Sequence, residues 1–208
     1  MTLDLRAYDF GDWSDLSRAH EKASELMNAL VADKKMMAQL FDGVRDNPAL
    51  FAMSETLTLD DKVVLYDGLE SQGFRLRLHV STGKSTEVAH DHRFPLTTKI
   101  MTGGYIQRIY TGPAENPTGC IAREEPPGAC YTLDDSAIHS NIAMPNTTLL
   151  IVRGPTRKKR AQGKVMGTGQ IYYKEGARDE SADVKERHKM TLQRLEQLRL
   201  LLAELNVI

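Results

Sequence analysis

The stretch from Lys62 to Glu175 contains a series of short strand-like segments with no helical pattern between them. In "FRLRLHV", apolar Phe74, Leu76 and Leu78 alternate with polar residues, as in a strand that buries one face. Other such segments, separated by Gly and Pro, are "KVVLYDG", "KIMTGGYIQRIY", "GCIARE", "ACYTL", "TTLLIVRG" and "GQIYYKEG". Many short strands without intervening helices predict an antiparallel sandwich or barrel, not a βαβ sheet.

Helical patterns lie on both sides of this β region. Apolar residues recur at helical spacing from Ser14 to Val44, which predicts one long helix or two shorter ones, and Pro48 suits the start of a further short helix. We therefore predict a helical segment at residues 1–56, a β-barrel at 57–175 and a C-terminal helix at 176–208.

The C-terminal helix is expected between Ser181 and Asn206. It carries a leucine stripe at 3-4-3 spacing, formed by Leu195, Leu198, Leu202 and Leu205. A stripe of about two heptads is too short for an extended coiled coil, so it either packs on the domain or forms a dimer seam. We predict a homodimer.

The composition excludes several classes of protein. The chain has 208 residues, is 41% hydrophobic and carries a net charge of −1, with its main basic run confined to residues 157–160. We expect no nucleic-acid partner, because a broad basic face is absent. We also expect no membrane association and a cytoplasmic location, because no apolar run approaches about 18 residues and the first residues lack the order of a signal peptide. Cys120 and Cys130 are expected to be free thiols.

The stretch "VAHDHRFPLTTKIMTGGY" holds two histidines one residue apart, on what is expected to be a strand. Side chains two apart on a strand point the same way, so His90 and His92 can share a ligand while Asp91 faces away. The alternative is a pair of ordinary surface histidines. A third imidazole is offered by His139 in "GACYTLDDSAIHSN".

The two histidine stretches resemble the paired motifs of the cupin superfamily, which are small double-stranded β-helix (jelly-roll) barrels with a metal ion inside. In the first motif, His90, His92 and Gly104 are in register, and Thr97 stands where the family has a glutamate ligand.

The second motif keeps its spacing through Gly128 and His139, although Asp134 and Ser136 replace its proline and glycine. The resemblance covers residues 63–155. It implies a three-histidine metal site of His90, His92 and His139.

The implied site holds Fe(II) as the preferred metal, with Zn, Mn, Ni or Cu as alternatives. Three neutral imidazoles leave a divalent ion with its full charge, which favours an anionic substrate. Within the superfamily, the "HDH" and "DDSAIH" stretches are similar to those of cysteine dioxygenase and related thiol dioxygenases. The strand "NTTLLIVRGP" departs from that pattern, since it supplies neither the histidine nor the tyrosine that assist thiol oxidation there.

The remaining candidate residues concern the substrate. We predict Arg75, Arg77, Thr97 and Gln107 as substrate-binding residues, and Tyr105 and Arg153 as catalytic ones. Arginines on one strand face can bind a carboxylate with two hydrogen bonds, provided that this face looks into the barrel and not into solvent.

The sequence thus predicts a mononuclear metal-dependent oxidoreductase, a non-heme iron oxygenase acting on a small anionic or amino-acid-like molecule. One alternative is an isomerase, lyase or N–N-bond-forming cupin that uses its metal as a Lewis acid. Another is a small-molecule-binding cupin without catalysis.

Overall fold

The structure is a computed structural model that describes residues 4–84, 86–176 and 179–208. Its helical elements are η1 (Leu5–Ala7), α1 (Leu16–Ala32), α2 (Lys34–Asp46), α3 (Pro48–Ala52), α4 (Ala182–His188) and α5 (Leu192–Glu204). Its strands are β1 (Glu55–Thr56), β2 (Asp60–Gly68), β3 (Phe74–Ser81), β4 (Val88–His90), β5 (Leu96–Thr102), β6 (Tyr105–Thr111), β7 (Thr118–Glu125), β8 (Cys130–Leu133), β9 (Ile138–Ala143), β10 (Thr148–Arg153), β11 (Arg160–Val165) and β12 (Ile171–Glu175).

Within these described residues, the strands form two six-stranded sheets in which every paired strand is antiparallel to its neighbour. Sheet A has the order β1-β2-β3-β10-β5-β8, and sheet B has the order β12-β11-β4-β9-β6-β7. The prediction of a mainly β chain with helices at both ends is confirmed. Two facing sheets are the arrangement expected of a cupin barrel.

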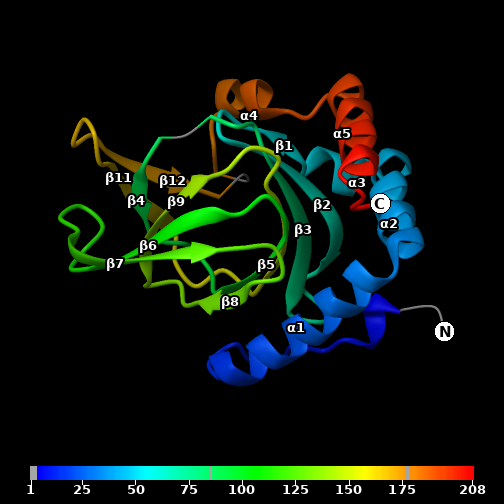
Figure 1. Cartoon of the computed structure of the whole chain (residues 1–208), viewed down its shortest axis with the longest axis horizontal. Helices are drawn as coiled ribbons and strands as arrows, with labels where there is room; N and C mark the ends of the chain where they lie inside the picture. The colour runs from blue at the N-terminus through cyan, green and yellow to red at the C-terminus, as the bar shows by residue number, and fades with distance from the viewer. Residues whose placement is uncertain (1–3, 85, 177–178) are drawn as a thin grey trace.

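Helices α1, α2 and α5 cover the outer face of sheet A, with α2 and α5 on the right of Figure 1 and α1 below them. The apolar residues of β3, namely Phe74, Leu76, Leu78 and Val80, pack there against α1, α2 and α5 in one buried cluster. Burying each such side chain is worth roughly 1.5–3 kcal/mol, so the helices and sheet A stabilise each other as one unit. Since the apolar face of β3 is used in this way, its polar face is left for the inside of the barrel.

Both helical regions are interrupted in the structure. The segment from Ser14 to Val44 forms two helices, α1 and α2, because Asp33 ends α1 and caps α2 by accepting a hydrogen bond of 2.9 Å from the Met36 amide. The C-terminal helix was predicted as one and is two. Between α4 and α5, Lys189 pairs with β1 as an isolated bridge and Met190 is buried.

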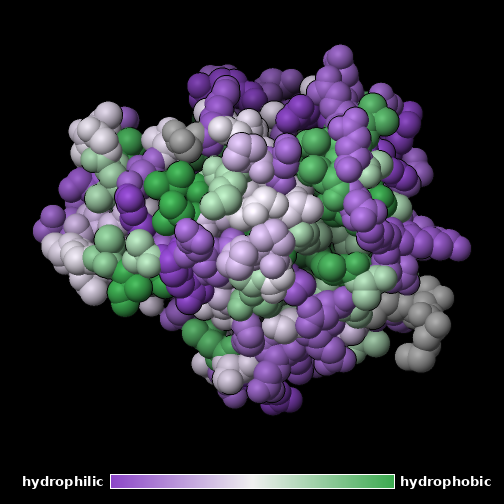
Figure 2. All heavy atoms as spheres, in the orientation of Figure 1, coloured by the Kyte–Doolittle hydropathy of each residue, from purple (hydrophilic) through white to green (hydrophobic). Residues whose placement is uncertain are grey.

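The leucine stripe of α5 packs on its own chain. Leu195, Leu198 and Leu202 are buried in the core under sheet A, and Leu205 is half-buried against it. Of the two roles predicted for the stripe, the structure therefore shows the first, and the homodimer stays a prediction without this support. Figure 2 shows a mostly hydrophilic face with apolar residues in separate small patches.

Two smaller features agree with the sequence. Gly103 and Gly104 join β5 to β6 with φ values of +68° and +133°, a conformation that favours glycine. Cys120 and Cys130 are free thiols.

Among the described helices, none combines the length and apolar character needed to cross a membrane.

Candidate metal centre and cavity

Three histidine side chains meet on the inner face of sheet B. His90 on β4 and His139 on β9 are direct cross-strand partners, and His92 follows two residues after His90. The ring centroids lie 4.7 to 4.9 Å apart in all three pairs, and one nitrogen from each ring lies within 4.8 Å of the others. The Nε2 atoms of His92 and His139 are 2.7 Å apart. The three residues predicted as metal ligands are therefore brought together.

The position of His92 differs from the prediction that both histidines lie on one strand. Strand β4 ends at His90, so His92 lies in the following loop. Hydrogen bonds hold this loop in place of a strand ladder: the His92 amide donates to the Asp135 carbonyl at 3.3 Å, and the Asp91 amide donates to the Gln162 carbonyl at 3.0 Å.

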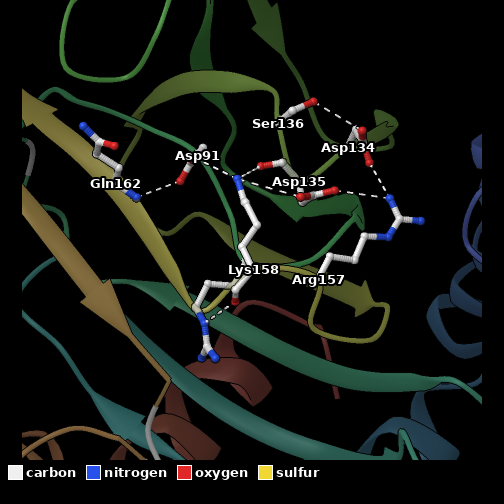
Figure 3. A network of polar contacts seen from close by, with 8 residues as sticks. Asp91, Asp134, Asp135, Ser136, Arg157, Lys158 and Gln162 are labelled. Atoms are coloured by element: carbon white, nitrogen blue, oxygen red, sulfur yellow. Dashed lines mark hydrogen bonds and ion pairs between the residues drawn. The ribbon is translucent and has the colours of Figure 1, made fainter.

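A charged network fixes the same loop (Figure 3). Asp91 points away from the metal centre, accepts a hydrogen bond of 2.7 Å from the Gln162 amide and forms an ion pair of 2.8 Å with Lys158. Lys158 also donates to the Asp135 carbonyl, which links the loop before β5 to the loop before β9. The loops that carry His92 and lead to His139 are therefore fastened to each other.

Hydrogen bonds behind the rings define which nitrogens face the centre. His90 donates from Nδ1 to the Val88 carbonyl at 2.9 Å, which leaves Nε2 as a lone-pair donor. The Gln107 side-chain amide lies 3.3 Å from His139 Nδ1, and Gln107 Oε1 is buried without a partner in the described structure. Turning this amide end for end lets Oε1 accept from Nδ1–H of His139, which gives Oε1 a partner and frees Nε2 for the centre.

The three imidazoles are suited to a divalent metal ion. Burial lowers the pKa of His90, and burial together with repulsion from the neighbouring histidines lowers the pKa values of His92 and His139 well below the ordinary value. The rings are thus neutral at neutral pH, as metal ligation requires. A neutral three-nitrogen set suits Fe(II), Zn(II) and neighbouring first-row ions, so the residues fit the implied metal.

The metal centre lies in the wall of a cavity of about 1700 Å³ between the two sheets. This exceeds the roughly 300–1,000 Å³ of ordinary ligand sites. Arg75 and Arg77 line it from β3, because the apolar face of that strand is packed under the helices. Arg153 lines it from β10, as the direct cross-strand partner of Arg75.

The other predicted substrate and catalytic residues lie in different places. Tyr105 is buried, lines the cavity and is hydrogen-bonded through its hydroxyl to that of Tyr131. Gln107 lies behind His139 and does not line the cavity. Thr97 is on the opposite face of β5, where its hydroxyl lies 2.8 Å from that of Thr132, under helix α1. Its neighbour Thr98 lines the cavity instead.

Phe94 and Lys62 are among the cavity residues that sequence reasoning missed. Phe94 lies in the loop after the histidines, with its ring centroid 6.1 Å from that of His92 and 4.3 Å from Cζ of Arg153. Lys62 is the cross-strand partner of His79 and contributes to lowering the pKa values of His90 and His92 by its positive charge. Phe94 could have been found from its place two residues after His92, whereas a single lysine in an apolar strand carries no such signal.

A second group of possible ligands, Glu55, Glu180 and His188, lies at the rim of the cavity, with donor atoms within 4.8 Å of one another. These side chains are only half-buried. Any measurement of metal content must separate this group from the histidine centre.

No protein-family model and no curated protein matches the chain. Several solved structures resemble part of it. An RmlC-like cupin protein from Desulfovibrio desulfuricans is 15% identical, with 47% of this chain and 83% of that one covered and a TM-score of 0.36. Ectoine synthase from P. lautus is 17% identical, with 63% and 88% covered and a TM-score of 0.41. A single-residue variant of oxalate decarboxylase from Bacillus subtilis is 12% identical, with 50% and 28% covered and a TM-score of 0.40.

Proposed function

We propose that this chain is a cupin-type metalloenzyme, in which His90, His92 and His139 hold Fe(II) and a small anionic substrate is oxidised with dioxygen. One observation carries the proposal: three neutral imidazoles converge on one point in the wall of a cavity whose opposite wall carries arginines. The motif spacing and the two facing antiparallel sheets support the cupin assignment.

Bound iron would supply a redox-active centre with open coordination positions beside the cavity. The protein supplies the rest. The hydrogen bonds from His90 to Val88 and between His139 and Gln107 orient the ligand nitrogens. Arginines on sheet A hold the anionic substrate, and Tyr105 with Tyr131 places two hydroxyl groups on the cavity wall. Burial raises the pKa of Tyr131, so its hydroxyl stays protonated and can donate a hydrogen bond at neutral pH.

The experiment begins with metal content. The purified protein is loaded anaerobically with Fe(II), and bound metal is measured by elemental analysis in a His188→Ala background that disables the rim group. We expect about one iron per chain, lost in His90→Ala, His92→Ala and His139→Ala while circular dichroism stays unchanged. A protein in which all three histidines are replaced and which keeps one iron per chain would refute the metal centre.

Oxygen uptake is then recorded with a panel of small carboxylates, amino acids, thiols and phosphonates. Substrate-dependent oxygen uptake that is absent from the His139→Ala protein supports the oxygenase. Turnover without oxygen uptake, or turnover supported equally by Zn(II), would assign the centre to Lewis-acid chemistry and refute the oxygenase.

A further inference from the structure

Two guanidinium groups in the cavity carry charges that their surroundings do not pair. Arg153 is 6% exposed, and its only hydrogen bonds in the described structure are two long ones of 3.4 Å, to the Gly154 carbonyl and the Thr156 hydroxyl. Its Nε and the Nε of Arg77 are buried without a partner among the described residues. Unpaired buried donors are costly, which points to a ligand that accepts their hydrogen bonds.

Arg75 lies beside them but is already paired. It donates to both carboxylate oxygens of Asp67, at 2.9 and 2.8 Å. This fork pairs the charge of Asp67 with that of Arg75, and neither Arg77 nor Arg153 forms an ion pair with Asp67 among the described residues.

Most of the other charges that face the pair cancel, apart from that of Arg93, which repels Arg153 and whose Nε donates a hydrogen bond of 3.1 Å to the Lys158 carbonyl. The carboxylates acting on Arg77 are Glu55, Asp60 and the paired Asp67. Glu55 and Asp60 are opposed by Lys62 and Lys174, which line the same cavity. Burial and repulsion between the guanidinium groups lower the pKa of Arg77 to about 10 and that of Arg153 to about 8. Arg77 and Arg153 thus have no carboxylate partner of their own among the described residues, and their charges destabilise each other until an anion binds.

Phe94 gives these groups a common platform. The Cζ atoms of Arg153 and Arg77 lie 4.3 and 5.7 Å from the centroid of its ring. Cation–π contacts of this kind hold the guanidinium groups in place while leaving their N–H groups free to donate. The Phe94 ring also lies next to His92, so this site is a short distance from the metal centre.

We propose that Arg77 and Arg153, held against Phe94, bind a doubly charged phosphate or phosphonate group of the substrate. The argument is charge balance: two unpaired guanidinium groups match a dianion, whereas a carboxylate or sulfonate leaves one charge uncompensated. A tetrahedral group also offers oxygens to both guanidinium forks at once. The inference rests on the proposed function insofar as the cavity is the substrate site, but the anion site can be tested without metal or turnover.

The test uses three probes that share a phenyl ring: phenylphosphonate above its second pKa, benzenesulfonate and benzoate. Their affinities are measured by calorimetry at constant ionic strength. We expect phenylphosphonate to bind at least tenfold more tightly than the other two. Arg77→Met and Arg153→Met should each abolish that preference, whereas Lys159→Met, which removes the same charge from an exposed position, should not change it. If a methionine variant fails to fold, Arg77→Lys and Arg153→Lys keep the charge but lose the fork, and should weaken phenylphosphonate binding at least tenfold.

Equal affinities for the three probes, or a preference that survives in both arginine variants, would overturn the proposal. The titrations are repeated with His90→Ala, His92→Ala and with inorganic phosphate. If the preference for phenylphosphonate persists in the histidine variants, the anion site belongs to the arginines, even if the metal or oxygen experiments fail. If the preference disappears in the histidine variants, the anion binds at the metal centre, and the arginine site is overturned. Inorganic phosphate binding as tightly as phenylphosphonate would overturn the assignment to a substrate group in favour of free phosphate.

Discussion

Thr97 and Thr98 are neighbours in the sequence and lie on opposite faces of β5. Thr98 faces the cavity, whereas Thr97 forms a chain of hydroxyl and imidazole contacts through Thr132 to His20 of α1, at 2.8 and 2.9 Å. The frame of the sequence motif placed Thr97 near the metal, as the counterpart of a glutamate ligand. The alternation of the strand places it under the helix instead.

Replacing Thr97 by valine should therefore keep the metal and reduce the free energy of unfolding by about 1 kcal/mol, because Thr132 loses a buried partner. Thr97→Glu should lower the free energy of unfolding and should not tighten metal binding, because it buries a carboxylate against α1. Urea denaturation and metal analysis measure both effects. Thr98→Val, on the cavity face, is the control that leaves the His20 contacts intact. A Thr97→Val protein that has lost its metal would contradict this placement.

At the scale of elements, the metal centre depends on how β4 ends. The strand stops at His90, and the ion pair between Asp91 and Lys158 takes over the positioning of His92. Lys158→Met should weaken metal binding by about tenfold or more, as is typical for residues that orient ligands. Competition with a chelator gives the dissociation constant. Lys159→Met is the control, because it removes the same charge from the next residue, whose side chain is exposed. An equal loss in both variants would exclude a specific role for Lys158.

The sequence predicted the elements with an alternating or helical apolar pattern, and it missed those without one. Strand β11, "RAQGKV", has no alternation, and its pairing with β4 and β12 depends on tertiary contacts. The inward face of β3 could not be predicted either. The alternating pattern of β3 defines an apolar and a polar face but not which of them faces the barrel. Arg75 and Arg77 point into the cavity because the helices pack on the apolar face. The histidine centre was predictable because two motifs carried it at fixed spacing.

At the scale of the whole molecule, helices α1, α2 and α5 from the two ends of the chain form one layer outside sheet A, and no described helix covers sheet B in the same way (Figure 1). Sheet A is therefore braced by α1, α2 and α5, while sheet B is held by its own strand pairs and by the loops of the charged network. The division into segments 1–56, 57–175 and 176–208 stays a prediction, since the helices of both outer segments share a core with the strands of the middle one.

The histidines and the arginines lie on opposite sides of the cavity: His90 and His139 belong to sheet B, with His92 in the loop after β4, and Arg77 and Arg153 belong to sheet A. A molecule bound to both the metal centre and the arginines would bridge the sheets, so the width of the cavity would select ligands of a particular length. For phosphonates with a carboxylate at the far end, affinity for the metal-loaded protein should pass through a maximum as the connecting chain is lengthened. The same series should show no maximum with His90→Ala, because only one end remains anchored. Calorimetry across the series measures the coupling between the two anchors, and a flat profile with the metal bound would mean that no ligand spans them.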